Sequence, residues 1–358
     1  DWSSDVCSSD LYYMKKNLKV LVIMSLVLII GIISTGCGDK RPVINVYNWG
    51  DYIDPSVIKD FEKEFNVKVN YNTFTTNEDM YVSIKKGGTS YDVAFPSDYM
   101  IERMIHEDML EKINKDNVPN LNNIEDRFLD LEFDPHNDYS VPYMWGTVGI
   151  IYNKTMVDDV VDSWDILWNE KYDGQILMLD SQRDSMAIAL KKLGYSMNSR
   201  DEKELEKAKE ELIKQKPLVY AYVGDEVKDL MVGEEAAIAV VWSGDAVAMI
   251  RNNSDLEYVI PKEGTNLWFD NMVIPKNAKN KEMAEKFINF MQRPEIAAKN
   301  TDYVGYSTAN YKAKELLPKD ITNSKVAYPT DKEIENTEIF KDPKDIIKLY
   351  DDIWLEIK

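Results

Sequence analysis

Four short stretches of the sequence place aromatic rings next to carboxylates: YNWGDY at 47–52, PSDY at 96–99, WSGDA at 242–246 and LWFDNM at 267–272. Ring faces attract ammonium groups and pack against methylene groups, while carboxylates neutralise an ammonium and accept its hydrogen bonds. Either of the last two stretches, taken alone, is better explained by a core tryptophan and a helix-capping aspartate. The four together favour a site for a linear organic cation over a sugar site, which would not require this excess of acid.

The sequence offers little for catalysis. Only His106 and His136 occur, and neither has a cysteine or a second histidine nearby, so we expect surface or capping roles for both. The motifs G-x-S-x-G, GxGxxG and H-E-x-x-H and a Walker loop do not occur. We expect a binding protein with no catalytic residue, cofactor or metal. An extracellular enzyme acting on amines or glycans stays as an alternative, because carboxylate pairs are plentiful.

Length and charge narrow the class of protein further. The chain has 358 residues, enough for two domains with their own cores. Its formal charge is −20, which argues against nucleic acid as a partner, because phosphate binding needs a basic surface. Such a charge could attract cations, or it could serve solubility alone.

The N-terminal region predicts export. Residues 1–13 precede the first methionine, Met14, and we interpret them as a non-native leader. Residues 14–36 then combine lysines, an apolar run of about 15 residues and small residues, as secretory signals do; the run is short for a membrane span. The ending STGC, 34–37, resembles a bacterial lipobox. It implies a lipidated Cys37, with an ordinary cleaved signal peptide as the alternative.

Elements that could position the aromatic and acidic residues alternate along the rest of the chain. Apolar runs and amphipathic spacing predict strand, helix, strand and helix at 43–47, 55–65, 67–74 and 78–86. A second series predicts strands at 147–153, 175–179, 218–221, 237–241 and 256–260 with helices at SWDILWNE, SMAIALKKLG and 201–215. A strand, a turn and a helix follow in 271–291. This alternation predicts an α/β protein with mostly parallel sheets and a ligand cleft between two lobes.

Several longer motifs resemble those of the spermidine/putrescine-binding proteins of bacterial ABC importers. The motifs, which keep the family's order between about 43 and 350, are NW..Y, YDVAFPSDYM, FDPHNDYSVPYMWGTVGIIYN, SWDILW, VVWSGDA, EGTNLWFDNMVIPKNAKNKE and VGYSTAN. The resemblance implies a two-lobed type II periplasmic-binding-protein fold with the ligand between the lobes. The implied lobes are 41–146 with 267–316, and 147–266 with 317–358.

The resemblance also implies which side chains bind the ligand. Rings would line the methylene chain, and carboxylates and a hydroxyl would hold the amines. The implied ligand-binding residues are Trp49, Asp51, Tyr52, Ser97, Tyr99, Asp184, Trp242, Asp245, Trp268, Asp270 and Tyr306.

Three positions depart from the family pattern. Gly50 replaces a polar residue, Ser181 stands where spermidine-preferring members have an aspartate, and Phe340 aligns with a polar residue. Because a carboxylate is missing at 181 while one is present at 245, we hypothesise that a shorter diamine is preferred.

These inferences define the expected function. We expect a monomeric receptor, lipid-anchored at the outer face of the cell membrane or periplasmic, that captures putrescine or spermidine and delivers it to an ABC permease. The alternative is a receptor of the same fold for another small solute, such as another organic cation, a sugar or an amino acid.

Overall fold

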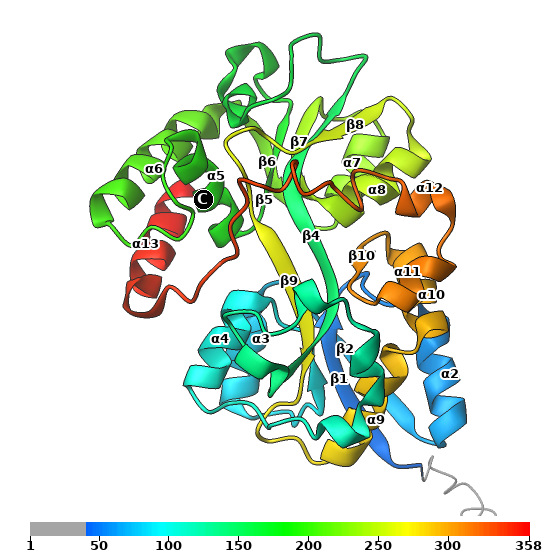
Figure 1. Ribbon diagram of the computed structural model, residues 1–358. Helices are drawn as coiled ribbons and strands as arrows, with labels where there is room; N and C mark the ends of the chain where they lie inside the picture. The colour runs from blue at the N-terminus through cyan, green and yellow to red at the C-terminus, as the bar shows by residue number, and fades with distance from the viewer. Residues whose placement is uncertain (1–40) are drawn as a thin grey trace, which may run out of the picture. The chain divides into compact units, whose positions relative to one another are not determined.

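The structure is a computed structural model that describes residues 41–358 (Figure 1). The predicted leader, the signal peptide and Cys37 lie outside the described residues. All elements below belong to the unit formed by residues 43–358.

The first part of this unit alternates strands and helices as the sequence predicts. In chain order the elements are β1 (Val43–Trp49), α2 (Pro55–Phe65), β2 (Lys68–Phe74), α3 (Asn77–Lys86), β3 (Val93–Ala94) and α4 (Asp98–His106). Short 3₁₀ turns follow at η1 (Lys115–Asn117), η2 (Pro119–Asn123), η3 (Asp126–Phe128) and η4 (Pro135–Asn137).

Local sequence explains the bounds of α2, which are those predicted. The Asp54 side chain accepts a hydrogen bond from the backbone N–H of Ser56, and Pro55 occupies the first helical position. Proline suits that position because its missing N–H would be unpaired there anyway. Asn66 ends the helix with a left-handed φ of 50°, so β2 can start almost at once.

The middle of the chain begins with a long strand and continues with a second α/β series. The elements are β4 (Ser140–Asn153), η5 (Trp164–Trp168), η6 (Glu170–Tyr172), β5 (Ile176–Leu179), α5 (Gln182–Lys192), α6 (Glu202–Gln215), η7 (Lys216–Leu218), β6 (Val219–Val223), α7 (Val227–Val232), β7 (Ile238–Trp242), α8 (Ser243–Asn252) and β8 (Leu256–Val259). The predicted helix SWDILWNE is wrong: Ser163 caps a single 3₁₀ turn, η5, and a second turn, η6, follows directly.

The C-terminal part returns to the first series before it joins the second. Its elements are β9 (Leu267–Val273), α9 (Lys281–Met291), α10 (Pro294–Val304), β10 (Ser307–Thr308), α11 (Tyr311–Leu316), α12 (Lys319–Thr322), η8 (Lys344–Ile346) and α13 (Ile347–Ile357). Buried side chains of α13 pack with those of α5 and α6. In Figure 1, α13 accordingly lies beside these two helices.

The strands form one path in the order β2-β1-β3-β9-β4-β7-β5-β6. The outer pairs are parallel, as predicted: β1 with β2 and β3, and β5 with β6 and β7. The central pairs are antiparallel, because β4 runs against β9, β7, β8 and β10. The expectation of mostly parallel sheets is therefore wrong at the centre of the path.

The two long strands β4 and β9 connect the two α/β series. β4 pairs with β9 over residues 140–147 and with β7 and β8 over residues 148–153. In Figure 1, β4 and β9 run from the elements around β1 to those around β7. This connection brings β9, the β1–α2 turn and the start of α8 to the same region.

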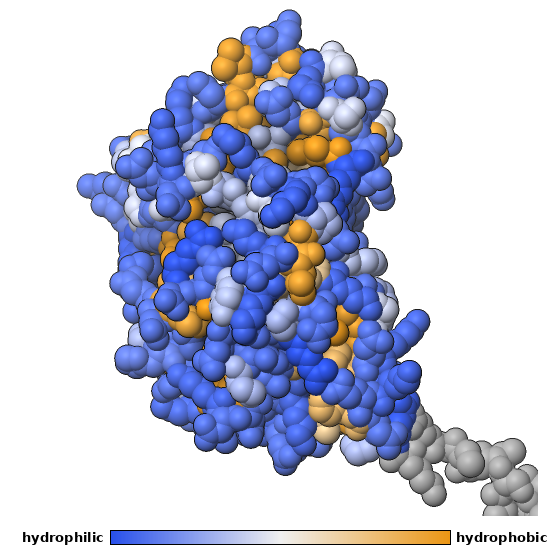
Figure 2. Space-filling view, turned by 45° about the vertical axis from the view of Figure 1, so that its right-hand side comes forward, coloured by the Kyte–Doolittle hydropathy of each residue, from blue (hydrophilic) through white to orange (hydrophobic). Residues whose placement is uncertain are grey.

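The face of the unit in Figure 2 is mostly hydrophilic, with several hydrophobic areas, the broadest of them at the top of the view. Within residues 41–358, no helix combines the length and the apolar content that crossing a bilayer requires.

Candidate ligand-binding site

The centre of the candidate site is the carboxylate of Asp270 in β9, which is only 6% exposed. The hydroxyl of Tyr52 donates to its Oδ2 at 2.7 Å, and the hydroxyl of Ser97 donates to its Oδ1 at 2.6 Å. Tyr52 comes from the β1–α2 turn and Ser97 from the N-cap of α4. The fold thus brings together three predicted residues that are far apart in the chain.

Asn77, which the sequence analysis missed, positions Ser97. Its Nδ2 donates to Ser97 Oγ at 3.0 Å, and its Oδ1 accepts from the Ser97 backbone N–H at 3.1 Å. With its oxygen already accepting from Asn77, the Ser97 hydroxyl directs its proton to Asp270. Asn77 is the first residue of α3, and its sequence neighbours give no signal of this role.

Aromatic rings pack edge to face beside Asp270. The Tyr306 ring lies 5.3 Å from the Tyr52 ring and 5.3 Å from the Trp268 ring, centroid to centroid. We call Tyr52, Trp268 and Tyr306 the aromatic wall. Tyr143 supports it, because its ring packs on Tyr52 and its hydroxyl donates to the Tyr52 carbonyl at 2.8 Å. Among residues 41–358, the buried indole N–H of Trp268 has no hydrogen-bond partner.

The aromatic wall fits closely against Gly244 at the start of α8. A Cβ added at Gly244 would lie 2.2 Å from ring carbons of Tyr306. We expect Gly244→Ala to displace this ring and to lower the free energy of unfolding by about 1–3 kcal/mol, measured by urea denaturation. Gly88→Ala is the matched control, since its Cβ would meet nothing within 4 Å. Equal stability of the two variants would contradict this account of the packing.

A second buried carboxylate, Asp184, lies in the first turn of α5 and acts electrostatically on Asp270. The Ser181 hydroxyl donates to Asp184 Oδ2 at 2.7 Å, and Ser181 also caps α5. Ser181, one of the three departures from the family pattern, therefore supplies a hydroxyl that hydrogen-bonds to the carboxylate of Asp184.

Asp245, in the first turn of α8, is the third buried carboxylate. The Tyr306 hydroxyl, in the aromatic wall, lies near enough to Asp245 to oppose the rise in its pKa that burial causes. Lys228 Nζ lies 3.9 Å from Asp245 and 3.1 Å from Asp51. Asp51 itself is mostly exposed, with 77% of its side chain accessible, so its contact is with this lysine at the edge of the site.

Burial controls the protonation of these carboxylates. Desolvation raises the pKa of Asp270 to about 6, against the hydrogen bonds from Ser97 and Tyr52, and the charge of Asp184 adds to the rise. Desolvation likewise raises the pKa of Asp184 and of Asp245 to about 6. Each carboxylate is costly to ionise where it lies, and a cation placed among them would relieve that cost.

The other predicted residues have hydrogen-bond partners or positions of their own, apart from the bonds to Asp270. Trp49 donates its indole N–H to the Phe95 carbonyl at 2.8 Å. Tyr99 donates its hydroxyl to Glu78 at 3.0 Å. Trp242, half-buried, is the N-cap residue of α8. The third departure, Phe340, is buried, and the Arg183 guanidinium stacks on its ring at 4.7 Å.

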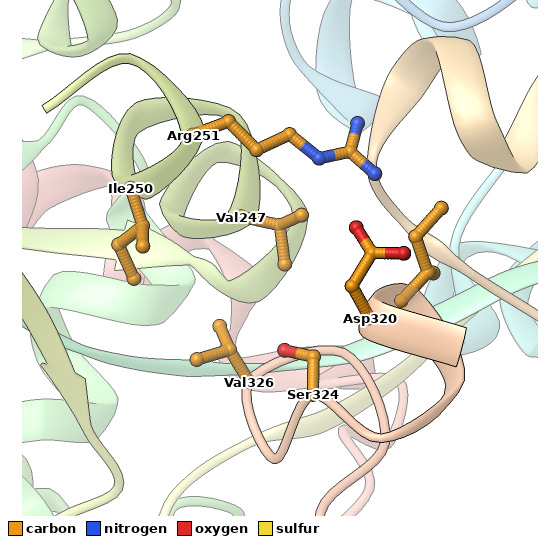
Figure 3. A pocket seen from close by; sticks show the side chains of 7 residues that line it. Val247, Ile250, Arg251, Asp320, Ser324 and Val326 are labelled. Atoms are coloured by element: carbon orange, nitrogen blue, oxygen red, sulfur yellow. The ribbon is translucent and has the colours of Figure 1, made fainter. Parts of the chain in front are cut away.

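A separate pocket of about 150 Å³ lies between α8 and α12 (Figure 3). Its charged lining groups are Arg251 and Asp320, and the Arg251 guanidinium also contacts Asp302. Its remaining lining residues are Val247, Ile250, Ile321, Ser324 and Val326. It shares no residue with the acidic and aromatic site.

Fold and site together define a two-lobed solute-binding protein of the periplasmic-binding-protein class, as the sequence predicts. The chain belongs to the bacterial extracellular solute-binding protein family, whose model matches residues 56–330.

Individual relatives carry more specific names. The chain is 39% identical to the spermidine/putrescine-binding periplasmic protein of Salmonella typhimurium, over 87% of this chain and 90% of the relative. A solved structure from Listeria monocytogenes, assigned to a spermidine/putrescine ABC transporter, is 49% identical with a TM-score of 0.86, covering 88% of this chain and 98% of its own. The spermidine/putrescine ABC transporter substrate-binding protein of Streptococcus pneumoniae is 45% identical with a TM-score of 0.76, over the same shares. The family resemblance predicted from the sequence motifs is confirmed.

Proposed function

We propose that this protein captures a polyamine outside the cytoplasm and delivers it to an ABC permease, without catalysis. The observation that carries the proposal is the buried carboxylate of Asp270, held by two hydroxyls beside the aromatic wall. The names of the relatives in Salmonella and Streptococcus support the same ligand class.

The chemistry of the site favours an organic cation over a neutral solute. Removing an ionised carboxylate from water costs several kcal/mol in order of magnitude unless a cation pairs with it. Asp184, Asp245 and Asp270 are all buried, and Asp270 accepts a hydrogen bond from Tyr52 in the aromatic wall. An extended chain of methylenes with ammonium groups would meet both kinds of surface, because rings accept the methylenes and carboxylates accept the ammonium protons.

A thermal-shift panel separates this function from the same-fold alternative. Ligands that bind only the folded state raise the melting temperature as concentration exceeds Kd. We expect putrescine and spermidine to raise it, and glucose, glutamate and glycine betaine to leave it unchanged. A shift with a sugar or an amino acid, and none with any polyamine, would support the alternative receptor. Turnover of an added amine or glycan by the purified protein would revive the enzyme alternative.

We propose that the lobes are 41–146 with 267–316, and 147–266 with 317–358. The pairing of β4 with β9 in one half and with β7 and β8 in the other supports a division at these strands. Ligand contacts from both lobes would favour a closed state, and this is how a hinge-type receptor reports occupancy.

We also propose that Cys37 carries a lipid anchor, so that the monomeric receptor stays at the outer face of the membrane. The sequence around Cys37 supports this, since a short apolar run ends in small residues directly before it. We expect Cys37→Ser to release the protein from the membrane fraction and to abolish labelling with radioactive palmitate. A variant that stays membrane-bound would contradict the anchor.

A further inference from the structure

Lys228 in α7 places a positive charge at one end of the candidate site. Its Nζ lies 3.1 Å from Asp51, 3.2 Å from Asp225 and 3.9 Å from Asp245. Only 24% of the Lys228 side chain and 7% of the Asp245 side chain are exposed. Burial alone would lower the pKa of Lys228, but these carboxylates outweigh it and raise the pKa, so the group is an ammonium at neutral pH.

Gly50 lies directly beside this arrangement. A Cβ at position 50 would lie 2.8 Å from Asp225 Oδ2, so the Asp225 carboxylate would have to shift. A larger side chain would therefore press on Asp225, which pairs with Lys228. The departure at Gly50 and the position of Lys228 thus belong to one local structure, formed by the β1–α2 turn and the start of α7.

We propose that Lys228 is a tethered ammonium that occupies the Asp245 end of the site and makes this receptor select diamines over longer polyamines. The inference rests on the proposed function, polyamine capture, and names the residue that limits ligand length. With Lys228 as the partner of Asp245, the buried carboxylates left for the ligand are Asp270 and Asp184.

Charge matching explains the selection. A diamine carries two ammonium groups, and each can pair with one of the remaining carboxylates. A third ammonium would have to share Asp245 with Lys228, and like charges brought that close repel each other. Exposed ion pairs contribute little to such discrimination. The pair of Lys228 with Asp245 is different because Asp245 is buried and its interactions are less screened by solvent.

The test compares the affinities for spermidine and putrescine in the purified protein and in Lys228→Gln. We expect the ratio of spermidine to putrescine affinity to rise at least about tenfold in Lys228→Gln, since this frees Asp245 for a third ammonium. Lys286→Gln is the control, because Lys286 pairs with Glu282 on the exposed face of α9; its ratio should equal that of the unaltered protein. A ratio in Lys228→Gln within twofold of the unaltered protein would overturn the proposal.

A double variant shows whether the gain arises at Asp245. In Lys228→Gln with Asp245→Asn, we expect the tenfold gain in the ratio of spermidine to putrescine affinity to be lost. If the gain persists, Lys228 acts through the overall charge of the site and not through Asp245, and the proposal is overturned. Should Lys228→Gln fail to fold, Lys228→Met, which keeps the apolar stem, replaces it. If the unaltered protein binds no polyamine, the proposed function fails. If it binds polyamines and the ratio does not move, only this inference fails.

Discussion

Asp270→Asn is expected to weaken polyamine binding on the order of 100-fold while the protein stays folded. The substitution keeps the shape of the side chain and removes its charge. Truncating one partner of a buried, hydrogen-bonded charge pair costs about 2–5 kcal/mol in binding, and 2.7 kcal/mol corresponds to roughly 100-fold in Kd. Calorimetric titration with putrescine measures the loss.

The same substitution should not destabilise the ligand-free protein. Because burial raises the pKa of Asp270 to about 6, its charge is unfavourable in the empty site at neutral pH. Asparagine removes that cost, because its Oδ1 can still accept a hydrogen bond from the Ser97 hydroxyl while its amide N–H donates to the Tyr52 oxygen. Asp60→Asn is the control, since Asp60 pairs with Lys299 on the surface. Unchanged putrescine affinity in Asp270→Asn would remove Asp270 from the site.

Polyamine affinity is expected to fall steeply as the pH drops below about 6. Asp184 and Asp270, the buried carboxylates left for the ligand, each have a pKa of about 6 in the ligand-free protein. Alkylammonium groups, with pKa values near 10, keep their charge throughout this range. Binding must therefore release protons from the carboxylates at low pH, and each released proton costs about tenfold in affinity per pH unit. Titrations at pH 7.5, 6 and 5 in two buffers of different ionisation enthalpy measure both the affinity and the released protons.

The free energy of unfolding of the ligand-free protein should rise as the pH falls, whereas polyamine affinity should fall. A buried aspartate with a pKa of about 6 binds protons in the folded state that the unfolded state releases near its ordinary pKa of about 4. Stability is therefore highest below pH 4 for such a group and falls as the pH rises through 6. The loss is on the order of 3 kcal/mol for one group. Polyamines should consequently raise the melting temperature more at pH 7.5 than at pH 5, and equal shifts would contradict this account.

Much of the fold could be predicted because local signals and tertiary packing agree. In α2 the spacing of apolar residues, the cap at Asp54 and Pro55 all indicate the same helix. The expectation of mostly parallel sheets failed because the residues of a strand do not determine the direction of its neighbours. The neighbours of β4 run antiparallel to it, as β9 does. At η5 the apolar spacing suits a helix, but the chain makes only one 3₁₀ turn.

Some residues of the candidate site could likewise be predicted from the sequence, and others could not. Trp268 and Asp270 stand in a motif whose ring and carboxylate pattern carries chemical meaning, whereas Tyr306 was implied only by the family resemblance. Asn77 and Lys228 could not be predicted, because an ordinary helical asparagine and an ordinary helical lysine gain their roles only from residues distant in the chain.

The central claim is that this site holds a polyamine through its buried carboxylates. Calorimetric titration of the chain from residue 38 onward, freed of bound ligand by unfolding and refolding, tests it most directly. The ligands are putrescine, spermidine, spermine and a neutral sugar. We predict saturable one-to-one binding of at least one polyamine at neutral pH and no heat of binding with the sugar. Absence of binding by every polyamine would contradict the claim and leave the fold with a different ligand.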